Sequence, residues 1–319
     1  MLKNKSKIFI LITVLLFAKL SFSSEDDSLY FKEYNNKITI KTDFLIKNLV
    51  LTISAKDKIV YKPGQGYIAG LYGAYKKIGM GFGISVFDEP QNELDSKSKL
   101  YDFRMNYFGR RLGVDGMFQY YRGFTVDEIS DNLADSLIDK ARPNQKLNSI
   151  GLNFYYSFNP NHSFKAIYNH TERQLRSNGA FLLGLSQTMT YIQTDEYFFP
   201  NELLNAYNIE NKTRFANLYS IAPVIGYQYT LIYKKFYFSP LLIIGAGAQF
   251  QKYSYEENSL KRDVRLNTRA LLHLPLGYNG EKIFFGIVYK YDYSKVKIET
   301  ATLHYNLPSF DVFFGMRFF

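Results

Sequence analysis

The chain has 319 residues and no cysteine, with 39 Lys and Arg against 29 Asp and Glu, a net charge of +10. The lack of cysteine argues against a lipid-anchored lipoprotein and against a disulfide-stabilised secreted domain. The basic residues form no continuous stripe, which disfavours a nucleic-acid partner, whereas modest positive charge suits an anionic membrane surface.

Residues 1–23 have the pattern of a cleavable secretory signal peptide. Lysines precede an apolar stretch over residues 8–18, and small residues follow at Ser21 and Ser23. This stretch is too short to cross a bilayer as a helix, which needs roughly 20 residues, although an uncleaved anchor is the alternative. We predict cleavage after Ser23, which leaves 35 basic and 29 acidic residues and a net charge of +6.

After a short polar segment at 24–36, predicted to be periplasmic, apolar and polar residues alternate with a period of two. This is the pattern of strands whose two faces meet different surroundings. Many candidates run ten residues or longer, which suits strands that cross a bilayer at a tilt better than the shorter strands of globular proteins. The candidate strands are residues 48–60, 66–76, 78–87, 101–108, 112–120, 148–158, 163–173, 179–192, 217–232, 235–253, 263–277, 281–294 and 310–319.

Long alternating strands and short polar turns such as "GRRLG" and "YNGE" predict an all-β fold, a transmembrane antiparallel β-barrel over residues 37–319. In lipid no backbone N–H or C=O can stay unpaired, so the sheet must close on itself. Bacterial barrels have even strand numbers, and we predict twelve, with ten or fourteen as alternatives. A secreted β-sandwich also alternates, but the strand length and the aromatic outer rows disfavour it.

Loop lengths predict which connections share a side of the membrane. Short turns near residues 110, 233 and 279 should be periplasmic, and long loops at 88–98, 123–147 and 193–216 external. The expected alternation of periplasmic and external connections fails once, between about residues 160 and 216. There, either a strand has been missed or one periplasmic connection is long.

Two of the long loops hold apolar residues at helical spacing. In the first loop these are Val126, Ile129, Leu133 and Leu137, and in the second Pro200 stands near the start of "PNELLNAYN". Each predicted helix would either pack on the barrel rim or fold into its mouth as a lid.

The final strand carries a row of large apolar residues that is predicted to face lipid. Its other row holds Asp311 and Arg317. Barrels that end on an aromatic residue are recognised by the barrel-assembly machinery, so this machinery and outer-membrane lipid are the predicted partners. The predicted assembly signature is Phe314, Met316 and Phe318.

Charged residues on the predicted inner rows are the candidate lining of the lumen. They either pair into a network that fills a narrow barrel or line a polar path for a solute, and paired rows are expected in both cases because unpaired buried charge is costly. A further charged patch, Glu172, Arg173 and Arg176, is predicted in a hairpin connection as a salt-bridged lock or a binding spot. The lumen candidates are Asp102, Arg104, Asp115, Arg265, Arg269, His273, Lys290, Asp292, Asp311 and Arg317.

The chain offers few candidates for catalysis. His273 alone among the four histidines lies on a polar inner row, and His162 neighbours Ser163 only in sequence, where side chains point apart. His170 lies on an apolar row, and His304 lies near the final loop. No metal-binding spacing or phosphate-binding glycine loop occurs, so we predict no catalytic residue, metal or cofactor.

Several blocks of the chain resemble an uncharacterised bacterial family, domain of unknown function 4421. They are "NYFGRRLGVDGMFQYYRGF" at 106–124, "GLNFYYSFN" at 151–159, "TERQLRSNGAFLLGL" at 171–185, "YKPGQ" at 61–65 and the terminal "FGMRF". The resemblance covers about residues 37–318 and implies an exported outer-membrane protein, without an activity or a substrate.

The sequence therefore predicts a bacterial outer-membrane barrel whose role is not enzymatic: a pore, a carrier, or a structural surface protein. One alternative is an outer-membrane lipid hydrolase of the lipid A deacylase or phospholipase type. Another is an adhesin or surface receptor that acts through its loops.

Overall fold

The computed structural model describes residues 29–54, 58–63, 66–86, 98–129, 141–195, 197, 213–254, 260–298 and 301–319. The predicted signal peptide, the helix predicted at 200–208, and Leu133 and Leu137 of the other predicted helix lie outside these residues. Val126 and Ile129 belong to a strand instead, so the helix predicted around them is wrong at its start.

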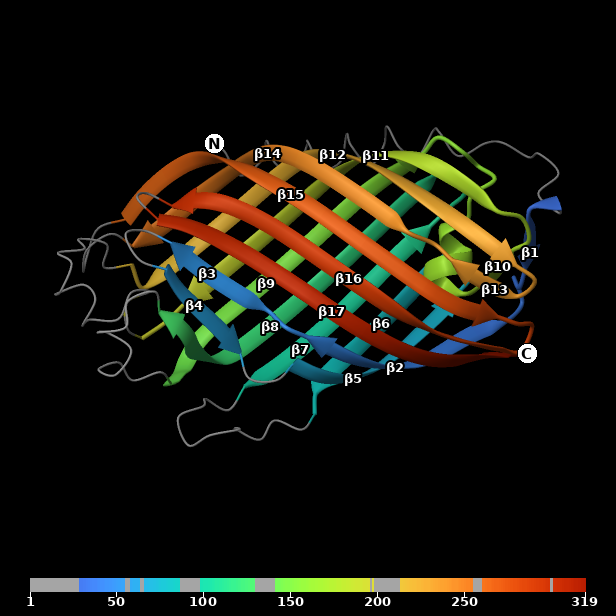
Figure 1. Ribbon diagram of the computed structural model, residues 1–319, viewed down its shortest axis with the longest axis horizontal. Coiled ribbons are helices and arrows are strands. Elements are labelled where there is room, and N and C mark those ends of the chain that lie inside the picture. Colours follow the sequence, from blue (N-terminus) through green and yellow to red (C-terminus); the bar gives the residue numbers. More distant parts are fainter. Residues whose placement is uncertain are drawn as a thin grey trace.

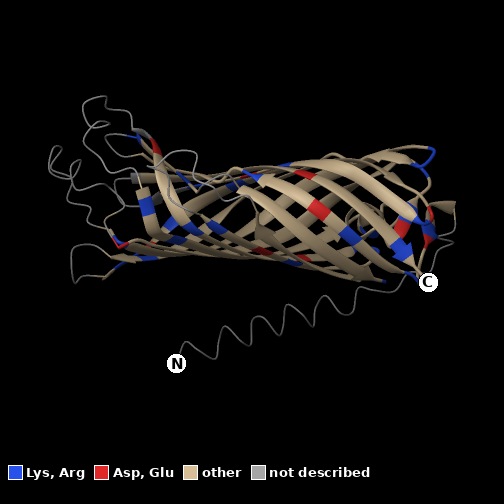
Figure 2. Cartoon of the chain, turned by 90° about the horizontal axis from the view of Figure 1, so that it is seen from below, with Lys and Arg blue, Asp and Glu red and all other residues tan. Residues whose placement is uncertain are grey.

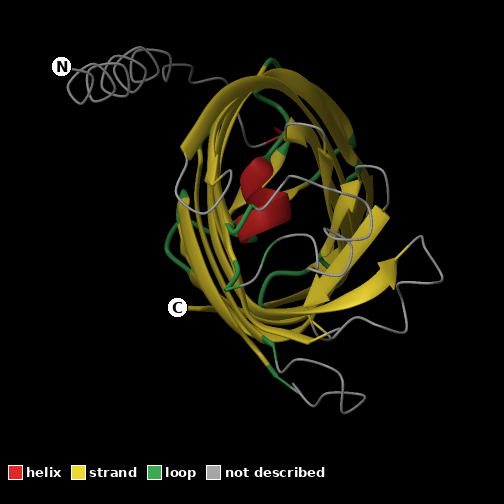
Figure 3. Ribbon diagram, turned by 90° about the vertical axis from the view of Figure 1, so that its left-hand side faces the viewer, coloured by secondary structure: helices red, strands yellow, loops and turns green. Residues whose placement is uncertain are grey.

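Twelve strand positions close into one antiparallel ring, as predicted (Figures 1 and 3). The ring closes because the last strand pairs with the first, with Phe318 opposite Ile38. In ring order the strands are β2 (Ile38–Lys47), β5 (Gly66–Tyr75), β6 (Ile78–Ser85), β7 (Lys99–Phe108), β8 (Leu112–Ile129), β9 (Ala141–Ser157), β11 (Asn178–Gln193), β12 (Phe215–Tyr233), β14 (Leu241–Ser254), β15 (Leu260–Asn279), β16 (Ile283–Ile298) and β17 (Ala301–Phe318).

The first strands differ from the prediction of a single strand at 48–60. β3 (Val50–Ser54) continues β2 along β17, and β4 (Lys58–Pro63) pairs back on β3. β4 then pairs directly with β8, with Pro63 opposite Phe124, beyond the ends of the short strands β6 and β7. The β3–β4 hairpin therefore completes the wall at the loop end, beyond the ends of β6 and β7. The sequence analysis did not identify β2 as a strand.

The two ends of the barrel differ. Short connections at 76–77, 109–111, 234–235 and 280–282 lie at the end that also holds the C-terminus, called here the turn end. At the opposite end, called the loop end, the strands β6, β8 and β11 finish and the strands β7, β9 and β12 begin. β13 (Phe236–Phe238) pairs with β12 and β15 at the turn end.

One connection at the turn end is long and enters the lumen. Residues 158–177 hold a single π-helical turn, η2 (Lys165–Asn169), and β10 (Glu172–Gln174), which pairs with β1 (Phe31–Glu33). The strand predicted at 163–173 is wrong, whereas the alternative of a long connection is confirmed. Phe164, Lys165 and Ala166 are all buried, so the alternation here does not separate two environments. Residues 29–36 and 158–177 are called the plug below.

The outer face of the barrel is apolar. Phe103, Ile287 and Phe314, for example, are between 39% and 49% exposed on strands whose neighbouring positions point inward. Figure 2 shows charged residues concentrated toward the two ends, with isolated bands along the strands. A belt of this kind suits contact with acyl chains. Among the described residues, no helix is long and apolar enough to cross a bilayer.

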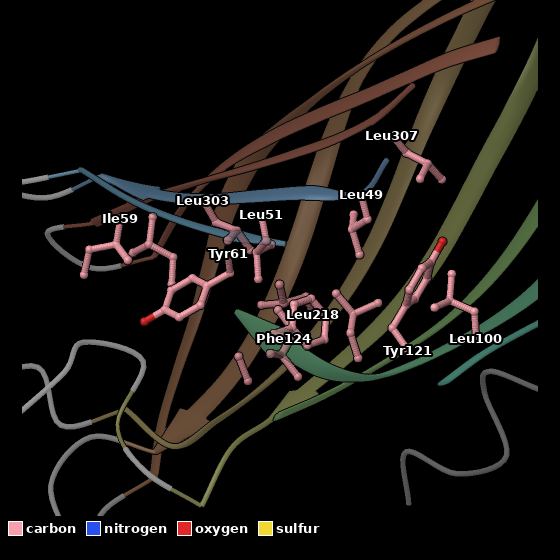
Figure 4. Close-up of a cluster of buried hydrophobic side chains, with 14 of the residues drawn as sticks. Leu49, Leu51, Ile59, Tyr61, Leu100, Tyr121, Phe124, Leu218, Leu303 and Leu307 are labelled. Carbon is pink, nitrogen blue, oxygen red and sulfur yellow. The ribbon is translucent and has the colours of Figure 1, made fainter. Parts of the chain in front are cut away.

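The lumen is filled differently along its length. At the loop end, inward apolar side chains from β3, β4, β8, β12 and β17 pack together, among them Leu51, Tyr61, Phe124, Leu218 and Leu303 (Figure 4). We call this packed group the loop-end cluster. The plug occupies the turn end, and its helical turn lies inside the ring (Figure 3). Asp102, Arg104 and Lys290 are among the charged residues that lie between the plug and the loop-end cluster. The sequence predicted a polar interior, so the apolar loop-end cluster is a correction.

Candidate functional site

A chamber of about 170 Å³ lies in the lumen between the loop-end cluster and the plug. Leu45 and Leu307 belong both to its lining and to the loop-end cluster, while Phe164 and Tyr168 of the plug form its floor. A smaller space of about 60 Å³ adjoins it at Met117. The chamber is larger than this adjoining space and is the candidate functional site.

One wall of the chamber is charged. Asp102 on β7 forms ion pairs with Lys47 on β2 and with Arg104, whose Nε lies 2.7 Å from the Asp102 carboxylate. Gln119 Nε2 also donates to Asp102 at 2.9 Å. These contacts surround one buried carboxylate with three donor groups, which offsets the cost of removing it from water.

Glycines on β6 make room for a tyrosine on this wall. A Cβ atom at Gly79 would lie 1.9 Å from the Tyr72 hydroxyl. The Tyr72 hydroxyl accepts from Asn106 Nδ2 at 2.7 Å and donates to Asn169 Oδ1 of the plug at 2.8 Å. A chain of hydrogen bonds thus connects β7, β5 and the plug.

Arg269 lies in the smaller space that adjoins the chamber. Its Nη2 lies 3.0 Å from Asp292 on the next strand, while Nη1 donates to Asn153 Oδ1 at 3.1 Å and to Ser186. Asn153 and Ser186 belong to β9 and β11, on the other side of the ring from β16. One guanidinium therefore ties separate parts of the wall together.

The opposite wall and the floor are apolar and aromatic. Phe108 stacks on Phe164 with ring centroids 5.5 Å apart, and Phe164 lies 6.3 Å from Tyr168. Tyr168 stacks in turn on His273, at 5.2 Å. Leu182, Leu241, Ile243 and Leu271 complete this side. The chamber is thus two-sided, with charge on one side and aromatic surface on the other.

Glu172 anchors the plug. Its side chain is fully buried and accepts from Arg110 Nη1 at 2.9 Å and from Ser163 Oγ at 2.6 Å, and it forms an ion pair with Lys165. Arg110 follows β7, so this ion pair connects the plug to the barrel rim. The lock reading of the charged patch agrees with these contacts of Glu172.

A second anchor comes from the last strand. Arg317 Nε donates to the His170 carbonyl at 2.7 Å and Nη1 to the Gly280 carbonyl at 2.5 Å, while Nη2 donates to Asn279. The guanidinium carbon also lies 4.1 Å from the centre of the Tyr34 ring. Among the described residues, Arg317 binds carbonyl groups rather than a carboxylate, and through these contacts and the Tyr34 ring it holds both parts of the plug.

Two buried histidines in the plug are held neutral. Burial lowers the pKa of His162 to about 4, and its Nε2 lies 3.0 Å from the Thr230 hydroxyl. Burial, followed by the positive charges of Lys41 and Arg317, lowers the pKa of His170 well below its usual value. Protonation of either ring in place would put a charge where no described carboxylate pairs with it.

We predict that acid loosens the plug. An exposed histidine takes up its proton near pH 6.5, whereas docked His162 does so only near pH 4, so docking is fully stable above pH 6.5 and weakens as the pH falls toward 4. His162 alone accounts for about 3 kcal/mol by proton linkage. Hydrogen exchange of residues 158–177, measured at several pH values with correction for the intrinsic rate, should show less protection at low pH. His162→Gln should reduce that dependence, and equal dependence in both proteins would contradict it.

The residues predicted to line the lumen lie in different parts of the barrel. Most point inward, but Arg265 lies near the loop end with its side chain 41% exposed and pairs with Asp263 at 2.6 Å. Of the patch at 172–176, Arg173 lies beside β1 and Arg176 lies over the Tyr30 ring at the turn end. Those that line the chamber are Asp102, Arg104, Asp115, His273, Lys290 and Asp311, with Arg269 and Asp292 in the adjoining space.

Sequence reasoning missed several chamber residues. Lys41 and Lys47 lie on β2, whose alternation in "ITIKTDFLIK" was visible but was not assigned to a strand. Phe164 and Tyr168 were assigned to a strand, so their place on the chamber floor could not be predicted. No local pattern marks a connection that folds back into a lumen.

The described residues contain no arrangement typical of hydrolysis. His162 contacts Thr230, His170 contacts Tyr237 and His304 contacts Tyr293, and none of these has a carboxylate that orients the ring among its hydrogen bonds. Within the same residues, no group of three His, Asp or Glu side chains could hold a metal ion.

Comparisons with known proteins concern the family and the overall fold. A family model described as a domain of unknown function (DUF4421) matches residues 25–318. No curated protein matches the chain. Similar solved structures include the outer-membrane protease OmpT from Escherichia coli, with 8% identity, a TM-score of 0.41 and coverage of 90% of this chain and 98% of that one.

Two further solved structures illustrate the range of similar proteins. The translocator domain of the autotransporter NalP from Neisseria meningitidis has 11% identity, a TM-score of 0.41 and coverage of 88% of both chains. The toluene transporter TodX from P. putida has 7% identity, a TM-score of 0.30 and coverage of 89% of this chain and 90% of that one. The activities in these names belong to those proteins.

Proposed function

Since the chain belongs to the DUF4421 family, described as a domain of unknown function, we propose its role from its own lumen. The protein is a passive carrier of the bacterial outer membrane, which admits a small solute into the chamber and releases it when the plug moves. The turn end faces the periplasm and the loop end faces outward.

The observation that carries this proposal is that a separate folded segment, the plug, closes the chamber on the side of the turn end. The plug is not a strand of the ring. Its contacts with the wall include side-chain hydrogen bonds and ion pairs through Glu172, Arg317 and Tyr72 and aromatic stacking through Phe164 and Tyr168. Such contacts can break without disturbing any backbone pairing between strands. A barrel with a purely structural role would need no separable floor.

The apolar loop-end cluster supports a carrier rather than an open pore. Leu218 and Phe124 are 3% and 0% exposed, so the described apolar side chains of this cluster pack closely and narrow the lumen there. Hydrophobic constrictions of this kind gate channels by excluding water. The resting protein should therefore conduct ions poorly.

Conductance in planar bilayers tests the proposal. The wild-type protein should show no steady conductance, whereas a variant with residues 160–176 replaced by a short glycine–serine linker should show brief discrete steps, because the floor is gone and the loop-end cluster alone opposes conduction by excluding water. A matched variant in which an equally long glycine–serine segment is inserted between residues 234 and 235 should stay silent. Silence of the plug-deleted protein, with heat-modifiable migration showing that it is folded, would contradict the proposal.

The lipid hydrolase and adhesin alternatives gain no specific support. The described residues hold no hydroxyl–histidine pair whose ring is oriented by a hydrogen-bonded carboxylate, and the long loops on which an adhesin would depend fall largely outside them. Non-enzymatic carriage is therefore the function that the site favours.

A further inference from the structure

We propose that the chamber binds one small uncharged aromatic molecule that carries a hydrogen-bond donor, a ligand of the phenol class. The inference deepens the proposed function and rests on it, because it names the class of solute that the carrier would take. Four properties of the chamber support it: its size, its aromatic surface, its charge balance and its unused acceptors.

The chamber has room for a single ring. Its volume of about 170 Å³ is slightly larger than the cavity of about 150 Å³ that accommodates benzene in an engineered protein core. A larger amphiphile such as a lipid does not fit without movement of the plug or of the loop-end cluster. The site therefore suits a solute of one ring with a small substituent.

Aromatic surfaces flank this space. Phe108, Phe164, Tyr168 and His273 form a continuous stack, with successive ring centroids 5.2–6.3 Å apart. Such distances are typical of aromatic pairs, and a further ring placed against Leu241 or Leu271 would extend the same packing.

The charges around the chamber cancel. Lys41, Lys47, Arg104 and Lys290 face four carboxylates, those of Asp102, Asp115 and Asp311 in the lining and that of Asp43, which lies 3.5 Å from Lys41. A ligand with a net charge would leave one charge uncompensated in a site largely shielded from water, which is unfavourable. This balance selects an uncharged molecule over an aromatic acid or amine.

Two acceptors in the lining have no donor. Among the described residues, neither Asn106 Oδ1 nor Asp311 Oδ1 has a hydrogen-bond partner, although both atoms are buried. Buried acceptors without donors are destabilising, so a ligand that donates to one of them gains more than a hydrocarbon can. A phenolic hydroxyl supplies that donor, while its ring contacts the aromatic side.

Ligand-detected NMR on the folded protein in detergent tests the inference, with phenol, toluene, benzoate and benzylammonium as probes. Phenol should bind with one-to-one stoichiometry and at least about tenfold more tightly than each of the other three. Absence of phenol binding, or tighter binding of either charged probe, would overturn the inference. Equal binding of toluene would overturn the assigned role of the acceptors.

Variants place the ligand within the chamber. Leu271→Phe fills the apolar side and should abolish phenol binding, whereas Leu272→Phe, on the same strand but outward-facing, should leave it unchanged. Asn106→Leu should weaken phenol about tenfold while toluene stays unaffected. Phenol binding that persists in Leu271→Phe would show that the ligand lies elsewhere and would refute the site.

The two proposals can fail separately. If the plug-deleted barrel conducts but the wild-type protein does not bind phenol, the proposed ligand class is refuted and the proposed carrier function stands. If the wild-type protein binds phenol but the plug-deleted barrel does not conduct, the carrier function is refuted. The chamber would then be a binding site in a closed barrel.

Discussion

Glu172→Ala is expected to release the plug. The carboxylate is fully buried and contacts Arg110, Lys165 and Ser163. Its loss leaves the two cationic side chains with only the partly exposed Glu33 as a described ion-pair partner. Removing one member of a buried ion pair typically costs about 3–5 kcal/mol. Because strand pairing is untouched, this cost should fall on docking of the plug rather than on the barrel.

Hydrogen exchange followed by mass spectrometry measures this effect. Amides of residues 163–174 should lose protection in Glu172→Ala while β12 and β15 keep theirs, and bilayer recordings should show intermittent openings. Glu281→Ala is the matched control, because that carboxylate also pairs with a lysine, Lys32, but at the exposed rim. Unchanged protection of the plug would show that Glu172 does not anchor it.

Asp102→Asn is expected to destabilise the barrel wall. The substitution keeps the size of the side chain. It removes the one carboxylate that, within the described part of the chain, forms ion pairs with Lys47, whose side chain is 5% exposed, and with Arg104. Two cations then share a neutral partner, at a cost of about 3 kcal/mol in folding stability. In the plug-deleted barrel the same change should also shift selectivity toward anions, because the lumen gains positive charge.

Urea unfolding in phospholipid vesicles, followed by far-ultraviolet circular dichroism, measures the stability change. The comparison variant is Asp263→Asn, whose ion pair with Arg265 lies near the loop end with both side chains partly exposed. Exposed pairs are worth less than about 1 kcal/mol, so this variant should unfold almost like the wild type. Equal stabilities of the two variants would mean that the Asp102 cluster does not contribute as described.

Gating by the plug would use contacts from distant parts of the chain. β1 lies near the N-terminus, η2 and β10 follow β9, and Arg317 is on the last strand. Each contact needs a closed ring, because the ring brings these segments together at the turn end. Plug docking should therefore follow barrel closure during folding.

The outer surface could be predicted from the sequence with little loss. The last strand shows why: Phe310, Val312, Phe314 and Met316 alternate with inward residues, and all four are 40% exposed or more. Each outward position favours an apolar residue because it contacts lipid, whatever the neighbouring strands contain. The alternation is therefore visible in the sequence of a single strand. The prediction failed at 163–173, where Phe164 and Tyr168 alternate in the same way but both rows are buried inside the lumen.

The sequence by itself predicted a signal peptide and long strands with one apolar and one polar face. From these strands it predicted a closed barrel of twelve strands with its polar rows inward. Only the tertiary structure decided how the interior is filled: the loop-end cluster, the chamber, and a plug held by Glu172 and Arg317. The physical reason is range. Alternation reports the local contrast between lipid and interior, residue by residue, whereas contacts across the lumen depend on register around the ring, which no single strand encodes.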